Sequence, residues 1–195
     1  MAITSIDICA RALVLIGASP LTSFADGTTE AIVASNIYDD TVRDLLSRHR
    51  WRFASGQSQL SRLVDVPDAR WSAAYQIPSD TILVHGVYSS DTPIEYDRYQ
   101  DKVFCDAVVE EEIYMDYTFQ AEEDLWPPYF VTAVTLQLAA IFAYSVAQQE
   151  ALADLMGKKA DRQFAIARGL DSQSQTSKKL NVQRFIQLRR SVRGI

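Results

Sequence analysis

Apolar and polar positions at the start of the chain follow the period of an α-helix. Cys9, Leu13 and Ile16 recur at helical spacing, and the pattern ends at Gly17, a residue suited to the position after a helix C-cap. A second helical pattern spans residues 30–50, and its core face carries Ala31, Ala34, Tyr38, Val42 and Leu45, with Arg48 at the rim. The sequence therefore predicts two helices followed by the aromatic residues Trp51 and Phe53.

Residues that cap helices stand at both predicted starts. Thr4 precedes the first helix and Asp7 follows three residues later, which is a weaker form of the capping box. Thr28 or Thr29 is expected to cap the second helix. The linker between the helices has the chemistry of turns at two places, Ser19-Pro20 and Asp26-Gly27.

The middle of the chain has the turn spacing of β-structure. A short strand is predicted at residues 60–64 within an irregular stretch. From Tyr75 onward, turn residues at 78–80 and 89–93 separate apolar runs, which predicts an antiparallel meander. Its predicted strands are residues 81–88, 94–99, 102–106 and 111–119.

Helical signals return after Trp126-Pro127-Pro128, because proline in the first turn marks a helix start. A helix rich in small residues is predicted over 128–149. The apolar stretch 129–147 contains Thr and Gln side chains, so a buried helix is expected there rather than a membrane span. Another helix is predicted over 152–168 and is expected to end at Gly169.

These elements predict an α+β fold that is mainly α. We expect a four-helix bundle formed by residues 1–53 and 127–171, with a small antiparallel β subdomain, residues 54–126, inserted between its halves. Residues 172–195 are expected to form an extended basic C-terminal arm. A chain of 195 residues with 48% hydrophobic residues can bury a core of this size without disulfides.

Charge is divided unevenly along the chain. The formal net charge is −6, yet residues 1–171 carry all 25 acidic and 13 of the 19 basic residues, a net charge of −12. Residues 172–195 contain no acid and have a net charge of +6. Such a segment predicts an acidic partner, either nucleic acid phosphates or an acidic protein surface. The apolar residues Phe185, Ile186 and Leu188 among these cations favour a protein.

Few residues have the spacing of a catalytic or metal site. His49 and His85 are the two histidines, and no Cys-x-x-Cys, His-x-x-x-His or His-Glu-x-x-His pattern is present. The 7 glycines form no nucleotide-binding loop, there is no Gly-x-Ser-x-Gly elbow, and Cys9 is expected to be a buried thiol. We therefore expect no enzyme, no cofactor and no metal. A small hydrolase that uses an Asp/Glu pair is the weaker alternative.

Two acidic clusters are candidate sites. Alternation along a strand would place Glu110 and Glu112 on one face, where they could bind a cation. A solvated strand edge, protected by charge from aggregation, is the favoured interpretation. The second cluster, Glu122-Glu123-Asp124, precedes a predicted helix and complements its dipole.

Three stretches of the chain resemble a known family, in the order that the family has. The first comprises Ile8-Cys9-Ala10-Arg11-Ala12-Leu13, Ile16-Gly17, Pro20-Leu21-Thr22-Ser23-Phe24 and the helix that leads to Trp51-Arg52-Phe53. The others are Tyr75-Gln76-Ile77-Pro78-Ser79-Asp80, and Trp126-Pro127-Pro128-Tyr129-Phe130 with Leu138-Ala139-Ala140. In these stretches the chain resembles tailed-phage head-to-tail adaptor proteins of the podophage tail tubular protein A type. The likeness is weakest after Ser172.

The resemblance implies a structural protein of the virion neck, assembled in the host cytoplasm. Such adaptors form a ring, typically of twelve copies, under the portal of a DNA-filled capsid. They extend the channel for double-stranded DNA without reading its sequence, and they present a docking surface to a downstream tail or nozzle protein. The family has no catalytic residues to carry over, and no membrane is implied.

Two groups of residues are candidate contacts on this interpretation. In related adaptors the C-terminal segment reaches the portal, so portal binding is predicted for Lys178, Lys179, Arg184, Phe185, Ile186, Leu188, Arg189, Arg190 and Arg193. A contact with a neighbouring subunit or with the tail is predicted for Pro20, Leu21, Phe24 and Asp26. An acidic body suits the lining of a DNA channel, because like charges discourage binding to phosphates. The alternative is a DNA-binding or packaging-regulating module that acts through the same arm.

Overall fold

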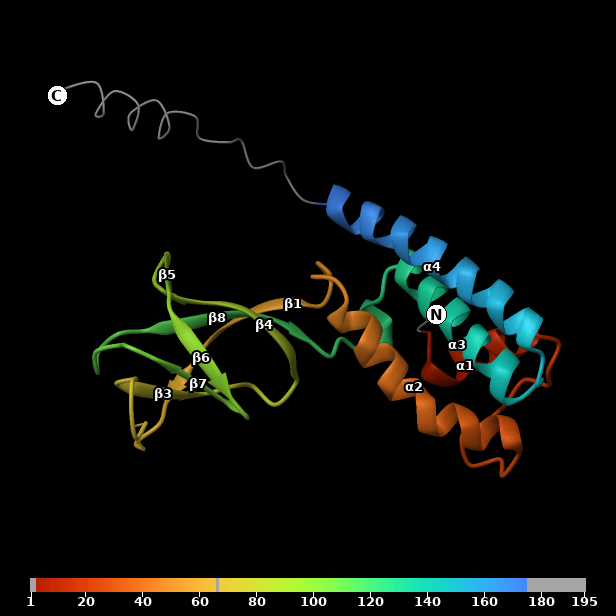
Figure 1. Cartoon of the computed structure of the whole chain (residues 1–195), viewed down its shortest axis with the longest axis horizontal. Helices are drawn as coiled ribbons and strands as arrows, with labels where there is room; N and C mark the ends of the chain where they lie inside the picture. The colour runs from red at the N-terminus through yellow and green to blue at the C-terminus, as the bar shows by residue number, and fades with distance from the viewer. Residues whose placement is uncertain (1–2, 66, 175–195) are drawn as a thin grey trace, which may run out of the picture.

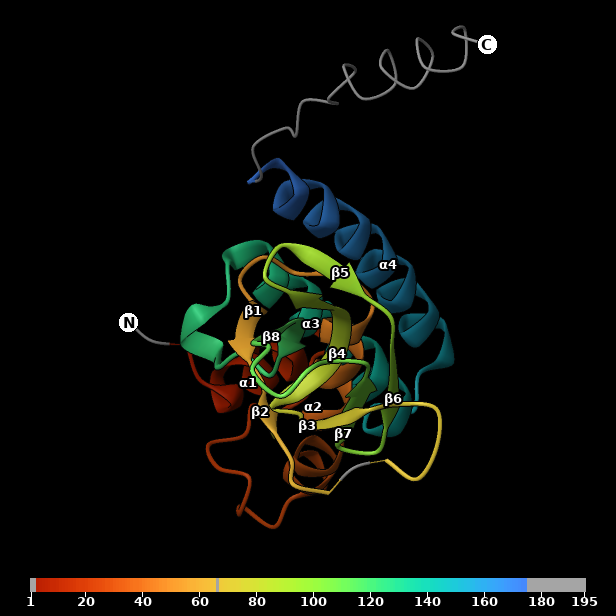
Figure 2. The same ribbon diagram turned by 90° about the vertical axis from the view of Figure 1, so that its left-hand side faces the viewer.

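The helices and the strands occupy two adjoining parts of the molecule, which a computed structural model describes over residues 3–65 and 67–174 (Figure 1). The helices α1 (Ser5–Leu15), α2 (Thr29–Ser47), α3 (Pro128–Ser145) and α4 (Glu150–Gln173) pack together at one end. The strands lie between α2 and α3 in the sequence, and a short 3-10 helix, η1 (Glu123–Leu125), leads into α3. Seen from the strand end, the strands stand in front of the helices and α4 runs along one edge (Figure 2).

The starts of the first two helices are as predicted. The Thr4 hydroxyl accepts from the Asp7 N–H at 3.2 Å, and the Asp7 carboxylate accepts from the Thr4 N–H at 3.0 Å, which completes a capping box. Gly17 follows α1 with a φ of +77°, a left-handed conformation that favours glycine. Thr28 caps α2 through its hydroxyl, which accepts from the Ala31 N–H at 3.2 Å.

The helices share one apolar core, with Trp51 near its centre. Trp51 is fully buried, and its indole N–H donates to the Leu45 carbonyl at 2.8 Å. Its ring contacts those of His49, Phe53, Tyr129, Phe130 and Phe164. The predicted core face of α2 is confirmed, because Ala31, Ala34, Tyr38, Val42 and Leu45 are all buried. The aromatic residues that follow α2 therefore form the part of the core against which α3 and α4 pack.

Helix α3 is the central helix of this part. In the described part of the chain it is the one helix long and apolar enough to cross a membrane, and half of that segment is buried in the molecule. Its buried residues include Phe130, Val134, Leu138 and Phe142, which belong to the core shared with α1, α2 and α4. Packing against these helices accounts for its hydropathy.

Within the described residues, eight strands form two antiparallel sheets of four. The first sheet has the order β1-β8-β4-β5 and consists of β1 (Ser55–Gln59), β8 (Ile113–Phe119), β4 (Thr81–Ser89) and β5 (Thr92–Ile94). The second has the order β2-β3-β7-β6 and consists of β2 (Ser61–Arg62), β3 (Ala73–Gln76), β7 (Lys102–Cys105) and β6 (Tyr96–Tyr99). The chain passes from the first sheet to the second at Leu60, whose N–H donates to the Ile113 carbonyl at 2.8 Å.

A second buried cluster lies between the two sheets. Val87, Ile113 and Met115 come from the first sheet, and Tyr75 and Val103 from the second. Alternate residues of β8 point to this cluster, as the pleat of a strand requires. The strands therefore have an apolar core of their own.

The predicted mainly α four-helix bundle is wrong. The described part of the chain is a sheet-rich α+β fold, in which four helices stand beside two four-stranded antiparallel sheets. The predicted meander is also wrong, because β8 pairs with β1 and β4, which are far from it in sequence. Strand β1, Ser-Gly-Gln-Ser-Gln, has no apolar alternation, and its register against β8 defines it as a strand.

Two element boundaries also differ from the sequence pattern. The predicted strand over 94–99 is divided between β5, which belongs to the first sheet, and β6, which belongs to the second. Helix α4 does not end at Gly169 but continues to Gln173. Buried Asp171 lies in this additional turn, so its contacts with the rest of the core offset the low helix propensity of glycine.

Candidate assembly surfaces

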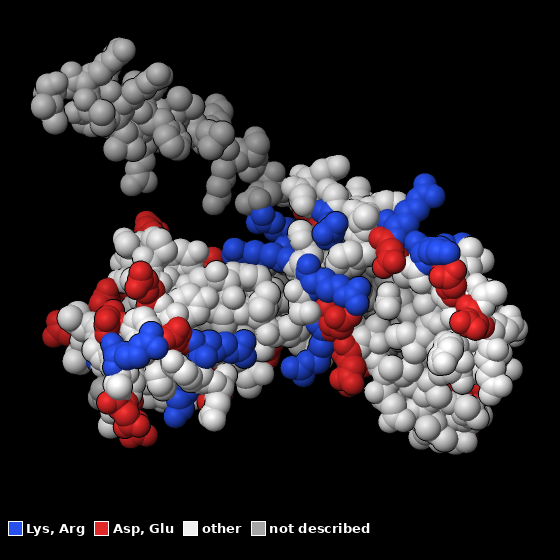
Figure 3. Space-filling view, in the orientation of Figure 1, with Lys and Arg blue, Asp and Glu red and all other residues white. Residues whose placement is uncertain are grey.

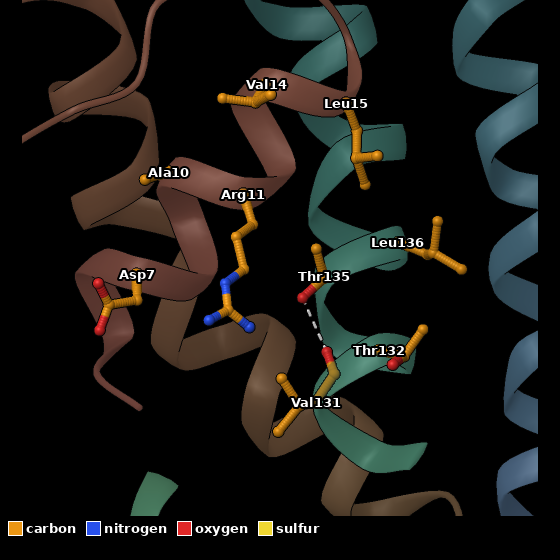
Figure 4. A pocket seen from close by; sticks show the side chains of 9 residues that line it. All are labelled: Asp7, Ala10, Arg11, Val14, Leu15, Val131, Thr132, Thr135 and Leu136. Carbon is orange, nitrogen blue, oxygen red and sulfur yellow. Dashed lines mark hydrogen bonds between the residues drawn. The ribbon is translucent and has the colours of Figure 1, made fainter. Parts of the chain in front are cut away.

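An apolar groove opens between α1 and α3 (Figure 4). It has a volume of about 640 Å³, and its apolar lining includes Val14 and Leu15 of α1 and Leu136 of α3. The side chains of Val14 and Leu15 are 60% and 47% exposed, although they follow directly on the buried Leu13. Helix α1 therefore has apolar residues on two sides, one facing the core and one facing the groove.

The polar groups of the groove are satisfied by their own helices. The Thr135 and Thr132 hydroxyls donate to the Val131 and Pro128 carbonyls of α3 at 2.8 and 2.9 Å. The hydrogen bonds from Thr4 hold the pKa of the Asp7 carboxyl below its ordinary value, and the charge of Arg11 lowers it further. With its threonine hydroxyls bonded within α3 and the Asp7 carboxylate bonded to Thr4, the groove has the chemistry of a contact surface rather than of a catalytic site.

The linker between α1 and α2 is built around Asp26. Its carboxylate accepts from the Thr22 N–H, the Thr22 hydroxyl and the Ser23 N–H at 2.9, 3.0 and 2.9 Å. These hydrogen bonds lower the pKa of Asp26. Of the other linker residues predicted to make a contact, Leu21 is buried in the core, Phe24 packs on the Tyr38 ring and Pro20 is exposed. A contact made by this linker stays a prediction, and Leu21 would support it from inside.

Asp26→Ala is expected to loosen the linker without unfolding the protein. The variant removes the acceptor for the Thr22 and Ser23 amides, which are exposed, so water replaces it at little cost in global stability. Hydrogen exchange measured by NMR is expected to be faster for these two amides, with an unchanged melting temperature. Thr22→Val serves as the control, because it removes the hydroxyl and keeps both amide hydrogen bonds. Unchanged exchange in Asp26→Ala would contradict the assignment.

The last turn of α4 is attached to the core through Asp171, which is fully buried. The Arg52 N–H donates to both carboxylate oxygens, at 3.1 and 3.2 Å, and the Tyr129 hydroxyl donates to Oδ1 at 3.0 Å. The His49 Nε2 atom lies 3.4 Å from Oδ2, an ion-pair distance, but the geometry is not that of a hydrogen bond. Burial, with the Asp171 carboxylate second, raises the pKa of Tyr129 to about 12. The last turn of α4 is thus fixed both to the segment that follows α2 and to α3.

The residues considered for catalysis or metal binding are separated in the structure. His49 lies beside Asp171, whereas the His85 Nε2 atom is hydrogen-bonded to the Thr118 hydroxyl at 2.7 Å in the β4–β8 pair. Glu110 and Glu112 lie in the loop before β8, and no group of three or more His, Cys, Asp or Glu residues within 3–65 and 67–174 is placed to hold a metal ion. Glu123 accepts from the Tyr38 hydroxyl at 3.0 Å, so it joins η1 to α2.

Charged side chains of both signs are distributed over the helices and the strands, and basic ones gather where the two parts meet (Figure 3). Arg48 and Arg168, from the ends of α2 and α4, lie over the Phe164 ring, and Arg50 pairs with Asp116 of β8 at 3.0 Å. The predicted portal-binding residues, from Lys178 to Arg193, lie outside the described residues.

Sequence reasoning missed the groove and the Asp171 anchor. A sequence signal existed for both. The run Leu13-Val14-Leu15-Ile16 is wider than one helix face, and Asp171 continues the spacing of Ala160 and Ala167 along the buried side of α4. The second signal was lost because the helix was predicted to end before Asp171.

Comparison with protein families places most of the chain. A family model described as a tail tubular protein matches residues 6–177, which is most of the chain. No curated protein matches the sequence.

Proposed function

The chain belongs to the tail tubular protein family, and on that premise we propose that it is the head-to-tail adaptor of a phage virion. Membership makes the chain a structural protein of the phage tail and supports a non-enzymatic role. As the adaptor it forms a ring beneath the portal, of twelve copies as in the proteins it resembles, and lies in the neck of the virion. The ring extends the channel for double-stranded DNA, and a downstream tail protein docks on its distal side.

The observation that carries this proposal is the exposed apolar surface of the helices. Val14, Leu15 and Tyr144 of α1 and α3, with Leu155 and Ile166 of α4, are all between 47% and 70% exposed. Val14 and Leu15 line one groove with Leu136, and apolar side chains exposed together in this way are typical of surfaces that become covered on assembly. A ring supplies such cover for every copy, because each subunit has two neighbours.

The basic C-terminal arm is proposed to bind the portal. Helix α4 ends at Gln173 next to the anchor formed by Asp171, so the arm starts from a fixed point on the core. The +6 charge of residues 172–195 suits an acidic protein surface, and its apolar residues can supply the anchors of such a contact.

The helices and strands are proposed to act as two domains. The helical domain comprises residues 1–53 and 127–171, the β domain comprises residues 54–126, and the arm follows from residue 172. Separate buried clusters in the helical part and between the sheets support this division.

The proposed function is tested by mixing the protein with the portal complex of the same phage. Native mass spectrometry is expected to show a ring of copies bound to the portal. A variant that ends at Ser174 is expected to keep its circular dichroism spectrum and to lose portal binding. Failure of the full-length chain to bind the portal as a ring would reject the adaptor role. Binding of duplex DNA that weakens steeply with salt would favour the DNA-binding alternative.

A further inference from the structure

We propose that the groove between α1 and α3 binds the outer face of α2 from the neighbouring copy of the chain. This inference rests on the proposed function, because it names the contact between successive subunits of the ring. It commits to a second copy as the occupant.

Helix α4 lies beyond the α3 side of the groove (Figure 4). Figure 4 shows Leu136 pointing from α3 toward α4. An apolar and basic stripe runs along α4. Its residues follow one another at steps of four, three, four and four, so they share one flank of the helix: Leu155, Lys159, Arg162, Ile166 and Leu170. All five are exposed within the described structure. An apolar stripe with two cations in its middle therefore runs along α4.

The position of this stripe follows from the opposite flank of α4. Phe164 contacts the Trp51 ring, and both Arg48 and Arg168 lie over Phe164, so this flank faces the end of α2. Ile166 is two residues from each of Phe164 and Arg168, which corresponds to about 200° around a helix. The stripe therefore faces away from the end of α2 and toward the side on which the groove opens.

The outer face of α2 has the complementary character. Val33, Ile37, Asp40 and Asp44 follow one another at steps of four, three and four, so they share one flank of α2. Val33 and Ile37 are half-buried at the edge of the helical core, whereas Asp40 and Asp44 are exposed, and Asp44 also pairs with Arg48 of the same chain. An apolar and acidic stripe on α2 is thus opposite in charge to the apolar and basic stripe on α4.

The two surfaces lie on different sides of the same subunit. Seen from the groove, α2 passes behind α1 and α3 (Figure 4). A contact between two different surfaces is head-to-tail, and its repetition generates a ring when the rotation closes. The basic arm is a poorer occupant, because its cations would face Lys159 and Arg162.

The direct test is cross-linking between exposed cysteines placed on the two surfaces. The double variant Val14→Cys with Asn36→Cys has one thiol in the groove and one on the outer face of α2. The native thiols do not interfere, because both are buried, and burial raises the pKa of Cys9 to about 12 and of Cys105 to about 11. With a bismaleimide and portal present, the double variant is expected to give a ladder beyond the dimer, whereas neither single variant does.

Charge reversal tests the same contact independently. Lys159→Glu with Arg162→Glu is expected to reduce ring formation at least about tenfold, since like charges then face each other across the interface. Asp40→Lys with Asp44→Lys is expected to do the same, and the four changes together are expected to restore the ring. Arg70→Glu with Arg98→Glu is the matched control, because it makes the same charge change among the strands and leaves the ring intact.

The outcomes separate this inference from the proposed function. If the unmodified chain never forms a ring with portal, both are rejected. If it forms a ring that is insensitive to the charge reversals, or if cross-linking stops at the dimer, the contact proposed here is wrong and the adaptor role stands. A ladder formed by Val14→Cys with Ser191→Cys in the arm, but not with Asn36→Cys, would assign the groove to the arm and overturn the proposal.

Discussion

Trp51→Ala is expected to lower the free energy of unfolding by about 3–5 kcal/mol, the range for removing a large aromatic side chain from a core. Trp51 is fully buried and contacts rings from α3 and α4, as well as those of His49 and Phe53. The change leaves a cavity where α2, α3 and α4 meet and leaves the Leu45 carbonyl without its donor. Urea denaturation followed by circular dichroism measures the loss.

Two further variants are compared with Trp51→Ala, one that keeps an aromatic side chain at the same position and one that removes an exposed aromatic side chain elsewhere. Trp51→Phe keeps an aromatic ring and loses the indole N–H, so we expect a smaller loss than for alanine. Tyr144→Ala removes an aromatic side chain that is 70% exposed, and a change within about 0.5 kcal/mol is expected. An equal loss for Trp51→Ala and Tyr144→Ala would contradict the central position of Trp51.

The helices could be predicted from the sequence because their signals are local. The Thr4 and Asp7 capping pair, Gly17 after α1 and the apolar face of α2 are each determined by residues within a few positions of one another. The proline-marked start of α3 is of the same kind. None of these signals requires knowledge of the rest of the chain.

The sheets could be predicted only in part, because strand pairing joins distant residues. Strand β1 has no apolar alternation and exists through its register with β8, about sixty residues away, as in the pair Ser55 and Thr118. The division of residues 92–99 between two sheets likewise depends on partners elsewhere, β4 for β5 and β7 for β6. Strands such as β1 were therefore not predicted from the sequence, and the fold was predicted to be mainly α.

The candidate surfaces depend on how helices pack, which the sequence pattern does not state. Val14 and Leu15 look like core residues in the sequence, and their exposure follows from the position of α3 beside α1. Asp171 looks like a residue beyond a helix end, and its burial follows from Arg52 and Tyr129, which are far away in sequence. In both cases the missing information is a tertiary contact.

Asp171→Ala is expected to lower the free energy of unfolding by about 3 kcal/mol, since it removes hydrogen bonds to a charged group and leaves the Arg52 N–H and the Tyr129 hydroxyl without their acceptor. Hydrogen exchange in the last turn of α4 is expected to become faster, because this carboxylate attaches the turn to the segment after α2 and to α3. Asp171→Asn keeps one acceptor oxygen, so a smaller loss is expected. Asp161→Ala removes the same charge from an exposed position of α4 and is expected to change stability by no more than about 0.5 kcal/mol. If Asp171→Ala and Asp161→Ala behave alike in denaturation and exchange, the buried carboxylate does not anchor the point from which the arm begins.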